Sequence, residues 1–195
     1  EMLRSLVGSE MCIRDRNDIC HEMSTCFADL LSDRQVTFIP GDAEQLSFPS
    51  GQDLIVSCSA LQWFVSPELF FKRCNALLSG HGYFAFSTFG KENLKEIAAV
   101  TGSGLHYYSL EELKKSLSMH YNIVTAGEER IRLTFATPLD VLYHLKHTGV
   151  TAVCRQAWTK GDLQEFCDKY AKLFSCGNAV TLTYHPLYII ARKKP

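Results

Sequence analysis

The sequence predicts one α/β domain in three layers, with helices on both faces of a mainly parallel sheet. Amphipathic helical segments alternate with short apolar strands, an order typical of sheets whose parallel strands are joined by helices. The strand expected over residues 53–57 is apolar without alternation, as strands covered on both faces are. Near the C-terminus two helices precede a long extended segment, which indicates a helical lid inserted before an antiparallel last strand.

The composition argues against nucleic-acid and membrane partners. With 195 residues, the chain is long enough for one domain with a substantial core. Its hydrophobic content of 46% and charged content of 21% are typical of globular proteins. The net charge is −1, and no apolar run approaches the roughly 20 residues of a membrane-spanning helix. We therefore expect a cytoplasmic protein that binds neither nucleic acid nor a membrane.

The eight cysteines do not indicate a metal site. They form no Cys-x-x-Cys pair, and no histidine lies at zinc-ligand spacing from a cysteine pair. Cys58, Cys74 and Cys167 fall in apolar segments, where a thiol usually serves as a small core residue. We expect reduced, structural thiols and no bound metal.

Residues 1–16 are predicted to be foreign to the protein. Residues 11–16 are what the codons ATG TGT ATA AGA GAC AGN encode, and this run matches the end of a transposon adapter used in sequencing libraries. No basic region followed by a continuous apolar stretch indicates a secretory signal. The alternative is a natural, poorly ordered N-terminal tail. We set residues 1–16 aside and expect the native sequence to start near Asn17, without its true beginning.

The first half of the remaining chain contains a helix and two strands. Apolar residues recur at helical spacing over residues 20–31, which predicts an amphipathic helix. A short strand is expected over residues 36–39, because Pro40 and Gly41 stop the run. The buried strand over residues 53–57 follows.

Capping residues mark the helices that come next. Ser66 followed by Pro67 is typical of a helix N-cap and first position, and this helix is expected to end at Leu78. Residues 80–82 predict a turn into an aromatic-rich strand over residues 83–89. Residues 109–112 form a capping box that opens another helix.

The C-terminal half contains the expected lid. Residues 121–126 and 130–135 resemble strands, and helices are expected to begin at Thr137 and Thr159. Residues 180–190 are extended, and the proline within them predicts a bulge or an unpaired stretch.

Two acidic residues lie where strands of an open α/β sheet end, which is where such sheets bind ligands. Asp18, just before a helix, can accept hydrogen bonds from both hydroxyls of a ribose; the alternative is an ordinary N-cap. Asp42, in a Gly-Asp-Ala sequence after a strand, can accept from an adenine amino group while the next amide donates to a ring nitrogen. The alternative for this second segment is a simple turn.

A third segment, residues 57–63, leaves the buried strand with small residues and then presents Gln62 and Trp63. These residues can form a wall for a flat ligand. The alternative is that Trp63 packs in the core.

The order and spacing of these segments resemble the class I methyltransferases. That family has an acid after its second strand, Gly-Asp-Ala after its third and a small-residue segment after its fourth. Residues 77–89 look like the family's turn into its fifth strand. Residues 135–151 are similar to the lid of the malonyl-acyl-carrier-protein O-methyltransferases, and residues 180–193 to their closing strand. The likeness covers residues 17–193, and the Leu-Lys-x-x-Gly element at 145–149 is its most discriminating part.

The resemblance implies a Rossmann-like three-layer sandwich with a mostly parallel sheet and an antiparallel C-terminal strand. It implies a partial methyltransferase domain over residues 17–195, with a helical lid at about 137–175. The family's first strand and glycine-rich loop have no counterpart, and Gly8 alone cannot supply the loop. We therefore expect the source gene to encode an enzyme and this exact polypeptide to be inactive.

The implied cofactor is S-adenosylmethionine. The residues that the resemblance assigns to its site are Asp18, Ile19, Met23, Gly41, Asp42, Ala43, Ser57, Leu61 and Trp63. The implied reaction is methyl transfer to the free carboxylate of a malonyl thioester on acyl-carrier protein or CoA, an early step of biotin synthesis. Such a carboxylate is ionised at neutral pH, so no general base is needed.

Three residues are candidates for positioning the substrate. Lys146 could hold the carboxylate, or it could be a lysine at the edge of an apolar helix face. Tyr184 and His185 could line the same pocket, although a histidine in a strand is more often structural. A basic surface for an acidic carrier protein could come from Lys91, Lys95, Lys114 and Lys115.

Other functions fit part of the pattern. The cofactor segments suit equally a class I methyltransferase acting on another small molecule, such as a quinone precursor. A methyltransferase-like binding module without its cofactor loop is a second alternative. A nicotinamide-dependent reductase shares the topology, but the Gly-Asp-Ala segment and the antiparallel last strand disfavour it.

Overall fold

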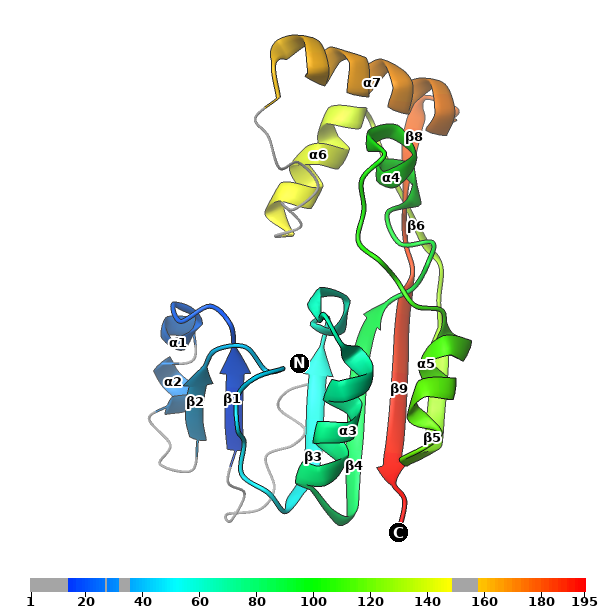
Figure 1. The fold of residues 1–195 in the computed structure, drawn as a ribbon. Helices are drawn as coiled ribbons and strands as arrows, with labels where there is room; N and C mark the ends of the chain where they lie inside the picture. The colour runs from blue at the N-terminus through cyan, green and yellow to red at the C-terminus, as the bar shows by residue number, and fades with distance from the viewer. Residues whose placement is uncertain (1–13, 27, 32–35, 149–157) are drawn as a thin grey trace. The chain divides into compact units, whose positions relative to one another are not determined.

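The computed structural model describes residues 14–26, 28–31, 36–148 and 158–195 (Figure 1). The chain divides into two compact units, Glu1–Pro49 and Ser50–Pro195. Of the segment predicted to be foreign, residues 1–13 lie outside the described residues.

The first unit contains two parallel strands and two short helices. Strands β1 (Arg14–Asp18) and β2 (Val36–Pro40) pair in register from Arg14 opposite Val36 to Asp18 opposite Pro40. Helices α1 (Met23–Cys26) and α2 (Ala28–Leu31) lie within the helix expected over residues 20–31, of which Phe27 is outside the described residues. Strand β1 was not expected, because its Arg-Asp-Arg-Asn-Asp sequence has no apolar pattern and only its pairing with β2 reveals it.

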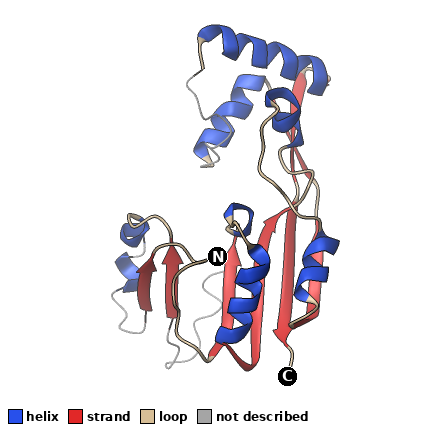
Figure 2. Cartoon of the chain, in the orientation of Figure 1, coloured by secondary structure: helices blue, strands red, loops and turns tan. Residues whose placement is uncertain are grey.

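The second unit is built on a four-stranded mixed sheet, drawn in red with the other strands in Figure 2. Its order is β3 (Gln52–Cys58), β4 (Leu78–Phe89), β9 (Pro186–Lys193) and β5 (Tyr121–Glu128). Strands β3 and β4 are parallel, whereas β9 is antiparallel to both of its neighbours. The expected antiparallel C-terminal strand is confirmed.

Helices α3 (Pro67–Leu77) and α5 (Leu110–Leu117) pack against this sheet (Figure 1). Helix α3 begins at Pro67 and α5 opens with the capping box of Ser109 and Glu112, both as expected. The Phe71 ring lies 5.6 Å from the Phe86 ring, and both side chains are buried. Burying each such side chain contributes about 1.5–3 kcal/mol, so this aromatic cluster anchors α3 to β4.

Strands β3 and β9 each carry exposed apolar side chains along one face. Leu54 and Val56 alternate with Ile55 along β3, while Tyr188 and Ile190 alternate with buried residues along β9. The expected burial of β3 on both faces is therefore wrong for the residues that the structure describes, because its outward side chains remain accessible. For the same reason Cys58 is exposed, unlike the expected core position, whereas Cys74 in α3 is buried.

The turn expected at residues 80–82 is instead part of β4. The β3–β4 register shifts between Gln52 and Leu54, so the strand continues through an irregularity. A Cβ atom on Gly82 would lie 2.8 Å from the Gln52 carbonyl oxygen. The glycine at position 82 is there because the neighbouring backbone approaches closely.

The second unit also contains a smaller substructure, which we call the cap. It comprises the antiparallel strands β6 (Ile131–Phe135), β8 (Ala179–Tyr184) and β7 (Ser175–Cys176) and the helices α4 (Lys95–Thr101), α6 (Pro138–His147) and α7 (Lys160–Phe174). Helices α6 and α7 begin at the predicted positions, and Thr137 and Thr159 each form a capping box there. They lie within the lid expected at about 137–175, of which residues 149–157 are outside the described residues.

The cap has its own core, formed by residues from all of its larger elements. Its buried members are Leu94, Ile97, Val141, Leu145, Phe166, Tyr170, Val180 and Leu182. Helix α4 was not predicted. It follows Leu94, which has a left-handed φ of 52°, and it carries the buried Glu96.

The chain passes from the cap to the main sheet at His185, between β8 and β9. The interruption predicted at Pro186 is confirmed, since Pro186 starts β9 opposite Phe89. Among the described helices, none is long and apolar enough to cross a membrane.

Candidate active site

The ends of β1 and β2 bring two of the predicted cofactor segments together in the first unit. The Asn17 side-chain amide donates to the carbonyl oxygens of Ile39 and Gly41, at 2.7 and 2.9 Å. The Gly41 amide in turn donates to the Asp18 carbonyl oxygen at 2.9 Å. Because the strands are parallel, Asp18 and the segment that begins at Gly41 lie side by side at one sheet edge.

Asp18 keeps one carboxylate oxygen available. Its Oδ1 accepts from the Cys20 amide at 2.8 Å, while Oδ2 has no partner among the described residues. Ile19 next to it is 77% exposed, and Met23 is half-buried in α1. A free carboxylate oxygen beside an exposed apolar side chain suits a sugar hydroxyl and the face of a flat ring.

The Gly-Asp-Ala segment offers an acceptor and a donor. Gly41 has a φ of 132°, and an added Cβ would lie 3.1 Å from Leu46, so the turn requires glycine. Asp42 accepts from the Glu44 amide and from the Gln45 side chain, both at 2.8 Å, and each oxygen retains a second lone pair. Among the described residues, the Ala43 amide has no hydrogen-bond partner. This pairing matches the polar edge of an adenine.

The third predicted segment lies in the second unit, after β3. Ser57 is half-buried near the end of β3, and Leu61–Trp63 form a short 3-10 helix, η1. Leu61 is buried, but Trp63 is 51% exposed, so the prediction that it forms a wall is favoured over core packing. Gln62 ties η1 to the strands, because it donates to the Ser59 carbonyl and accepts from the Thr88 hydroxyl.

A small open depression lies at the ends of β3 and β4. It is lined by Leu61, Gln62, Thr88, Phe89, His106, Tyr107 and Tyr108. The last three residues come from the segment between α4 and α5, which the sequence did not single out because the segment has no periodic pattern. The cluster of three ring-bearing residues between Gly104 and the capping box was the available signal.

A hydrogen bond from Asn93 holds the Tyr107 hydroxyl in place. The buried Asn93 donates from Nδ2 to the Tyr107 hydroxyl oxygen at 3.1 Å. Burial raises the pKa of Tyr107, so its hydroxyl stays protonated at neutral pH. The depression therefore presents a neutral phenol.

Tyr184 and Lys146 belong to the cap. The Tyr184 hydroxyl pairs with His144 Nε2 at 3.0 Å, and its ring lies 6.2 Å from the Phe89 ring, which lines the depression. Lys146 is exposed on α6, on the same side as the exposed Leu139 and Tyr143. Among the described residues, Lys146 has no acidic partner, so its charge is available to a ligand.

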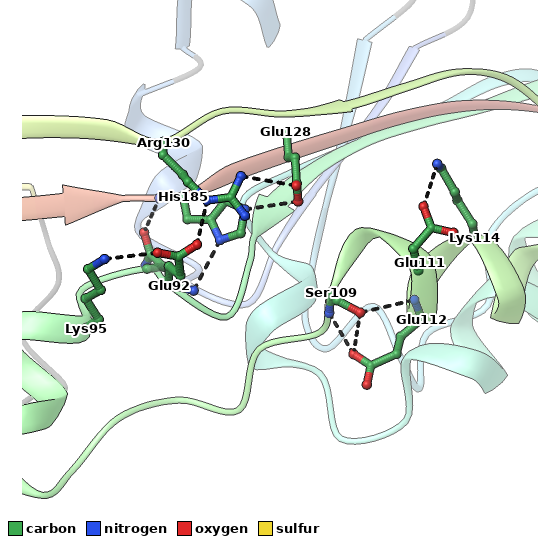
Figure 3. Close-up of polar contacts among 10 residues, drawn as sticks. Glu92, Lys95, Ser109, Glu111, Glu112, Lys114, Glu128, Arg130 and His185 are labelled. Atoms are coloured by element: carbon green, nitrogen blue, oxygen red, sulfur yellow. Dashed lines mark hydrogen bonds and ion pairs between the residues drawn. The ribbon is translucent and has the colours of Figure 1, made fainter.

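His185 has structural partners at both ring nitrogens (Figure 3). Its Nδ1 accepts from the Glu92 amide, and its Nε2 lies 3.1 Å from Glu128 Oε2. Because Nδ1 accepts an N–H, the proton of the neutral ring sits on Nε2 and is donated to Glu128. The buried imidazole therefore joins the cap to the main sheet, and no ring nitrogen remains for a substrate.

Charged residues surround this junction (Figure 3). Arg130 bonds to both Glu92 and Glu128, and Lys95 also pairs with Glu92. Arg130, followed by Lys95, lowers the pKa of Glu92 to about 2. The hydrogen bond from His185, followed by that from Arg130, lowers the pKa of Glu128. Over the described residues, no group of acidic, histidine or cysteine side chains could hold a metal.

Comparisons with known proteins agree on one family. A family model described as a methyltransferase domain matches residues 15–86. Malonyl-acyl-carrier-protein O-methyltransferase of Bacteroides thetaiotaomicron is 54% identical over 203 residues, which cover 99% of this chain and 77% of that protein. The protein of the same name from Bacteroides helcogenes is 50% identical and is covered over 70% of its length by 91% of this chain.

A solved structure supports the fold. A candidate methyltransferase from Bacillus halodurans superposes with a TM-score of 0.65 at 16% identity, over 93% of this chain and 84% of that one. Such low identity shows the fold alone. Together with the family model, it confirms the predicted fold class.

Proposed function

The chain belongs to the malonyl-acyl-carrier-protein O-methyltransferase family, and we propose that it transfers a methyl group from S-adenosylmethionine to the free carboxylate of a malonyl thioester. The thioester would be carried by acyl-carrier protein or CoA, and the step would belong to biotin synthesis. The observation that carries the proposal is the 54% identity to the Bacteroides thetaiotaomicron enzyme over 99% of this chain.

The residues after β1 and β2 fit the adenosine part of the cofactor. Asp18 would accept from the ribose hydroxyls through its free oxygen, and Ile19 would cover a ring face. Asp42 would accept from the adenine amino group while the Ala43 amide donates to a ring nitrogen. Ser57, Leu61 and Trp63 are among the other residues that the sequence assigns to the cofactor. When bound, the cofactor supplies a methyl group activated by a positively charged sulfur.

The reaction requires positioning more than proton transfer. A carboxylate oxygen of the malonyl group bonds to the methyl carbon as the carbon–sulfur bond breaks, and the electron pair of that bond stays on sulfur. The carboxylate is already ionised at neutral pH, so no residue has to remove a proton. The chain's contribution is to orient the carboxylate and to exclude water from it. The apolar and aromatic lining of the depression suits that role.

Lys146 remains the proposed cation for the substrate. Its exposure and its lack of an acidic partner among the described residues support this role. Replacing Lys146 with Ala is expected to raise KM for malonyl-CoA severalfold, whereas replacing Lys172, an exposed lysine of α7, should leave it unchanged. Equal effects of both substitutions would show that only overall charge matters.

A carrier-protein surface on the four predicted lysines has less support. Lys91, Lys95 and Lys114 form ion pairs with Glu112, Glu92 and Glu111. Their charges are therefore offset locally. Lys115 is exposed and has no ion pair among the described residues, so it is the member of this group that we propose for carrier binding.

Cofactor binding tests both the function and the prediction about residues 1–16. We would compare the unaltered chain with a restored chain, in which the N-terminal segment of the Bacteroides thetaiotaomicron relative precedes residues 17–195. Calorimetric titration with S-adenosylhomocysteine should show tighter binding by the restored chain. Equal affinity would mean that residues 1–16 do not interrupt the cofactor site.

A matched pair of variants tests the role of Asp18. In the restored chain, Asp18→Ala should weaken S-adenosylhomocysteine binding about 10- to 100-fold, the range for hydrogen bonds to a charged group. Asp53→Ala is the control, since Asp53 lies near the start of β3 and its carboxylate accepts from the Ser79 hydroxyl. Unchanged binding by Asp18→Ala would contradict the assigned site.

A further inference from the structure

The hydroxyls of Tyr107 and Tyr108, which both line the depression at the ends of β3 and β4, each keep a hydrogen without an acceptor among the described residues. Of these two, Tyr107 is the one whose oxygen accepts a hydrogen bond from a buried side chain. Asn93 Nδ2 donates to the Tyr107 oxygen, so Tyr107 acts as the acceptor in that bond. The hydroxyl of Tyr107 is therefore left with its own hydrogen to donate. Tyr107 lines the depression, which also includes the predicted cofactor residue Leu61.

The direction of the Asn93 bond follows from a second contact. Asn93 Oδ1 accepts from the His185 backbone amide at 3.2 Å, so Oδ1 and Nδ2 cannot be interchanged. The Asn93 backbone amide also donates to the Gly90 carbonyl at 2.9 Å. Asn93 is 5% exposed and is held at three points, so it fixes both the place of the Tyr107 oxygen and its role as an acceptor.

Thr88 and Gln62 have hydrogen-bond partners, whereas the side chains of His106 and Tyr108 have none among the described residues. The Thr88 hydroxyl donates to Gln62 Oε1 at 3.0 Å, and Gln62 Nε2 donates to the Ser59 carbonyl at 2.6 Å. Tyr108 faces acidic neighbours. Burial, followed by the nearby carboxylates of Glu68 and Glu112, raises its pKa. Tyr107 differs from Tyr108 in that a buried partner fixes its oxygen as an acceptor while its own hydrogen stays available to a ligand.

We propose that the Tyr107 hydroxyl donates to one oxygen of the malonyl carboxylate and leaves the other oxygen free to accept the methyl group. Asn93 is the positioning residue that keeps this hydrogen directed away from itself. The proposal rests on the proposed function, since it assigns the group that recognises the carboxylate of that substrate. It also adds an oriented donor to the proposed cation Lys146 in selecting a malonyl thioester over an acyl thioester without a carboxylate.

The test compares malonyl-CoA with propionyl-CoA, which has a methyl group in place of the carboxylate. Dissociation constants are measured by calorimetry on the unaltered chain, whose second unit contains every residue that the proposal uses. Kinetic constants are measured on the restored chain. Tyr107→Phe should weaken malonyl-CoA binding about 10- to 100-fold, the range for a hydrogen bond to a charged group, and leave propionyl-CoA unaffected.

Two further variants separate this role from a structural one. Tyr108→Phe removes a hydroxyl from the same wall and should keep the preference for malonyl-CoA. Asn93→Asp keeps the shape and the acceptor for the His185 amide, but its second oxygen claims the Tyr107 hydrogen. This variant should lose the preference although Tyr107 is present. Unfolding temperatures are measured on each variant, and binding is compared at a temperature where all are folded.

The outcomes distinguish the two proposals. If the wild type prefers malonyl-CoA and Tyr107→Phe keeps that preference, the role of Tyr107 is refuted and the proposed function stands. If the wild type has no preference and the restored chain does not methylate malonyl-CoA, the proposed function fails and the role of Tyr107 fails with it. Loss of the preference in Tyr107→Phe and Asn93→Asp, but not in Tyr108→Phe, supports the inference.

Discussion

Gly90 lies against the His185 ring at the junction between the cap and the main sheet, and we predict that Gly90→Ala destabilises the chain. A Cβ atom on Gly90 would lie 2.6 Å from both Cε1 and Nδ1 of the His185 ring. The ring cannot move without breaking its bonds to the Glu92 amide and Glu128, each 3.1 Å long. The buried Gly90 has no positive φ, so the cost is steric and not conformational.

The magnitude follows from these two terms. Overpacking a buried site costs about 1–3 kcal/mol, and each lost hydrogen bond costs about 0.5–1.5 kcal/mol. The ring can relax partly, so we expect the unfolding free energy to fall by about 2–4 kcal/mol. Urea denaturation followed by circular dichroism measures this change.

The matched control is Gly80→Ala, which lies in β4, whereas Gly90 directly follows that strand; an added Cβ on Gly80 has no atom within 4 Å. It should stay within about 0.5 kcal/mol of the wild type. The double variant Gly90→Ala/His185→Ala should be no less stable than His185→Ala alone, because the clash is gone. If Gly90→Ala is as stable as Gly80→Ala, the described packing of His185 is refuted.

Three further predictions follow from side-chain environments. Arg130 and Lys95 lower the pKa of Glu92 to about 2, so its contribution to stability is present above its ordinary pKa of 4.5 and is lost as pH falls toward 2. Glu92→Gln should therefore flatten the decline in unfolding free energy between these two pH values. An unchanged decline would contradict the pairing. Cys74 is buried with its pKa raised to about 12, so alkylation of the native chain followed by peptide mass spectrometry should label exposed Cys58 and Cys176 but not Cys74; equal labelling would contradict its burial. Trp63 is exposed at the proposed cofactor wall, while Trp158 packs on Phe166. S-adenosylhomocysteine should therefore change the fluorescence of Trp158→Phe, which keeps Trp63, but not that of Trp63→Phe. The reverse pattern would refute the assignment.

Local chemistry made much of the fold predictable. The capping boxes at Ser109, Thr137 and Thr159 each contain both of their reciprocal hydrogen bonds, and these depend only on residues three positions apart. Pro186 likewise marks the passage from β8 to β9, because a proline cannot donate to a sheet. Where a signal depends on neighbouring residues alone, the sequence was sufficient.

Helix α4 could not be predicted, because distant contacts hold it in place. Its N-cap residue Leu94 has a left-handed φ, and the Leu94 amide donates to the Thr183 carbonyl in β8. Glu96 is 2% exposed and accepts from both the amide and the hydroxyl of Thr183. A glutamate in a sequence predicts an exposed side chain, and the burial of Glu96 is explained by its partner Thr183, 87 positions away.

The candidate site was predictable in part. Asp42 follows a predicted strand, so the general rule for ligand sites in open α/β sheets located it, whereas Asp18 was singled out as an acid just before a helix. Tyr107 was missed because its role depends on a hydrogen bond from Asn93, across the unpredicted helix α4. His185 was expected to line a pocket, but its partners Glu92 and Glu128 come from segments far away in the sequence. The position of residues after strands is local information, whereas the partners of a side chain are not.

The most direct test of the proposed function is the chemical form of the transferred methyl group. The restored chain is incubated with methyl-labelled S-adenosylmethionine and malonyl-CoA, and the product is treated with mild base. A methyl ester releases its label as methanol under these conditions, whereas a methyl group on nitrogen, carbon or a phenol does not. We predict base-released label with malonyl-CoA and none with propionyl-CoA. Label that resists base, or transfer that does not require the carboxylate, would contradict the proposed function.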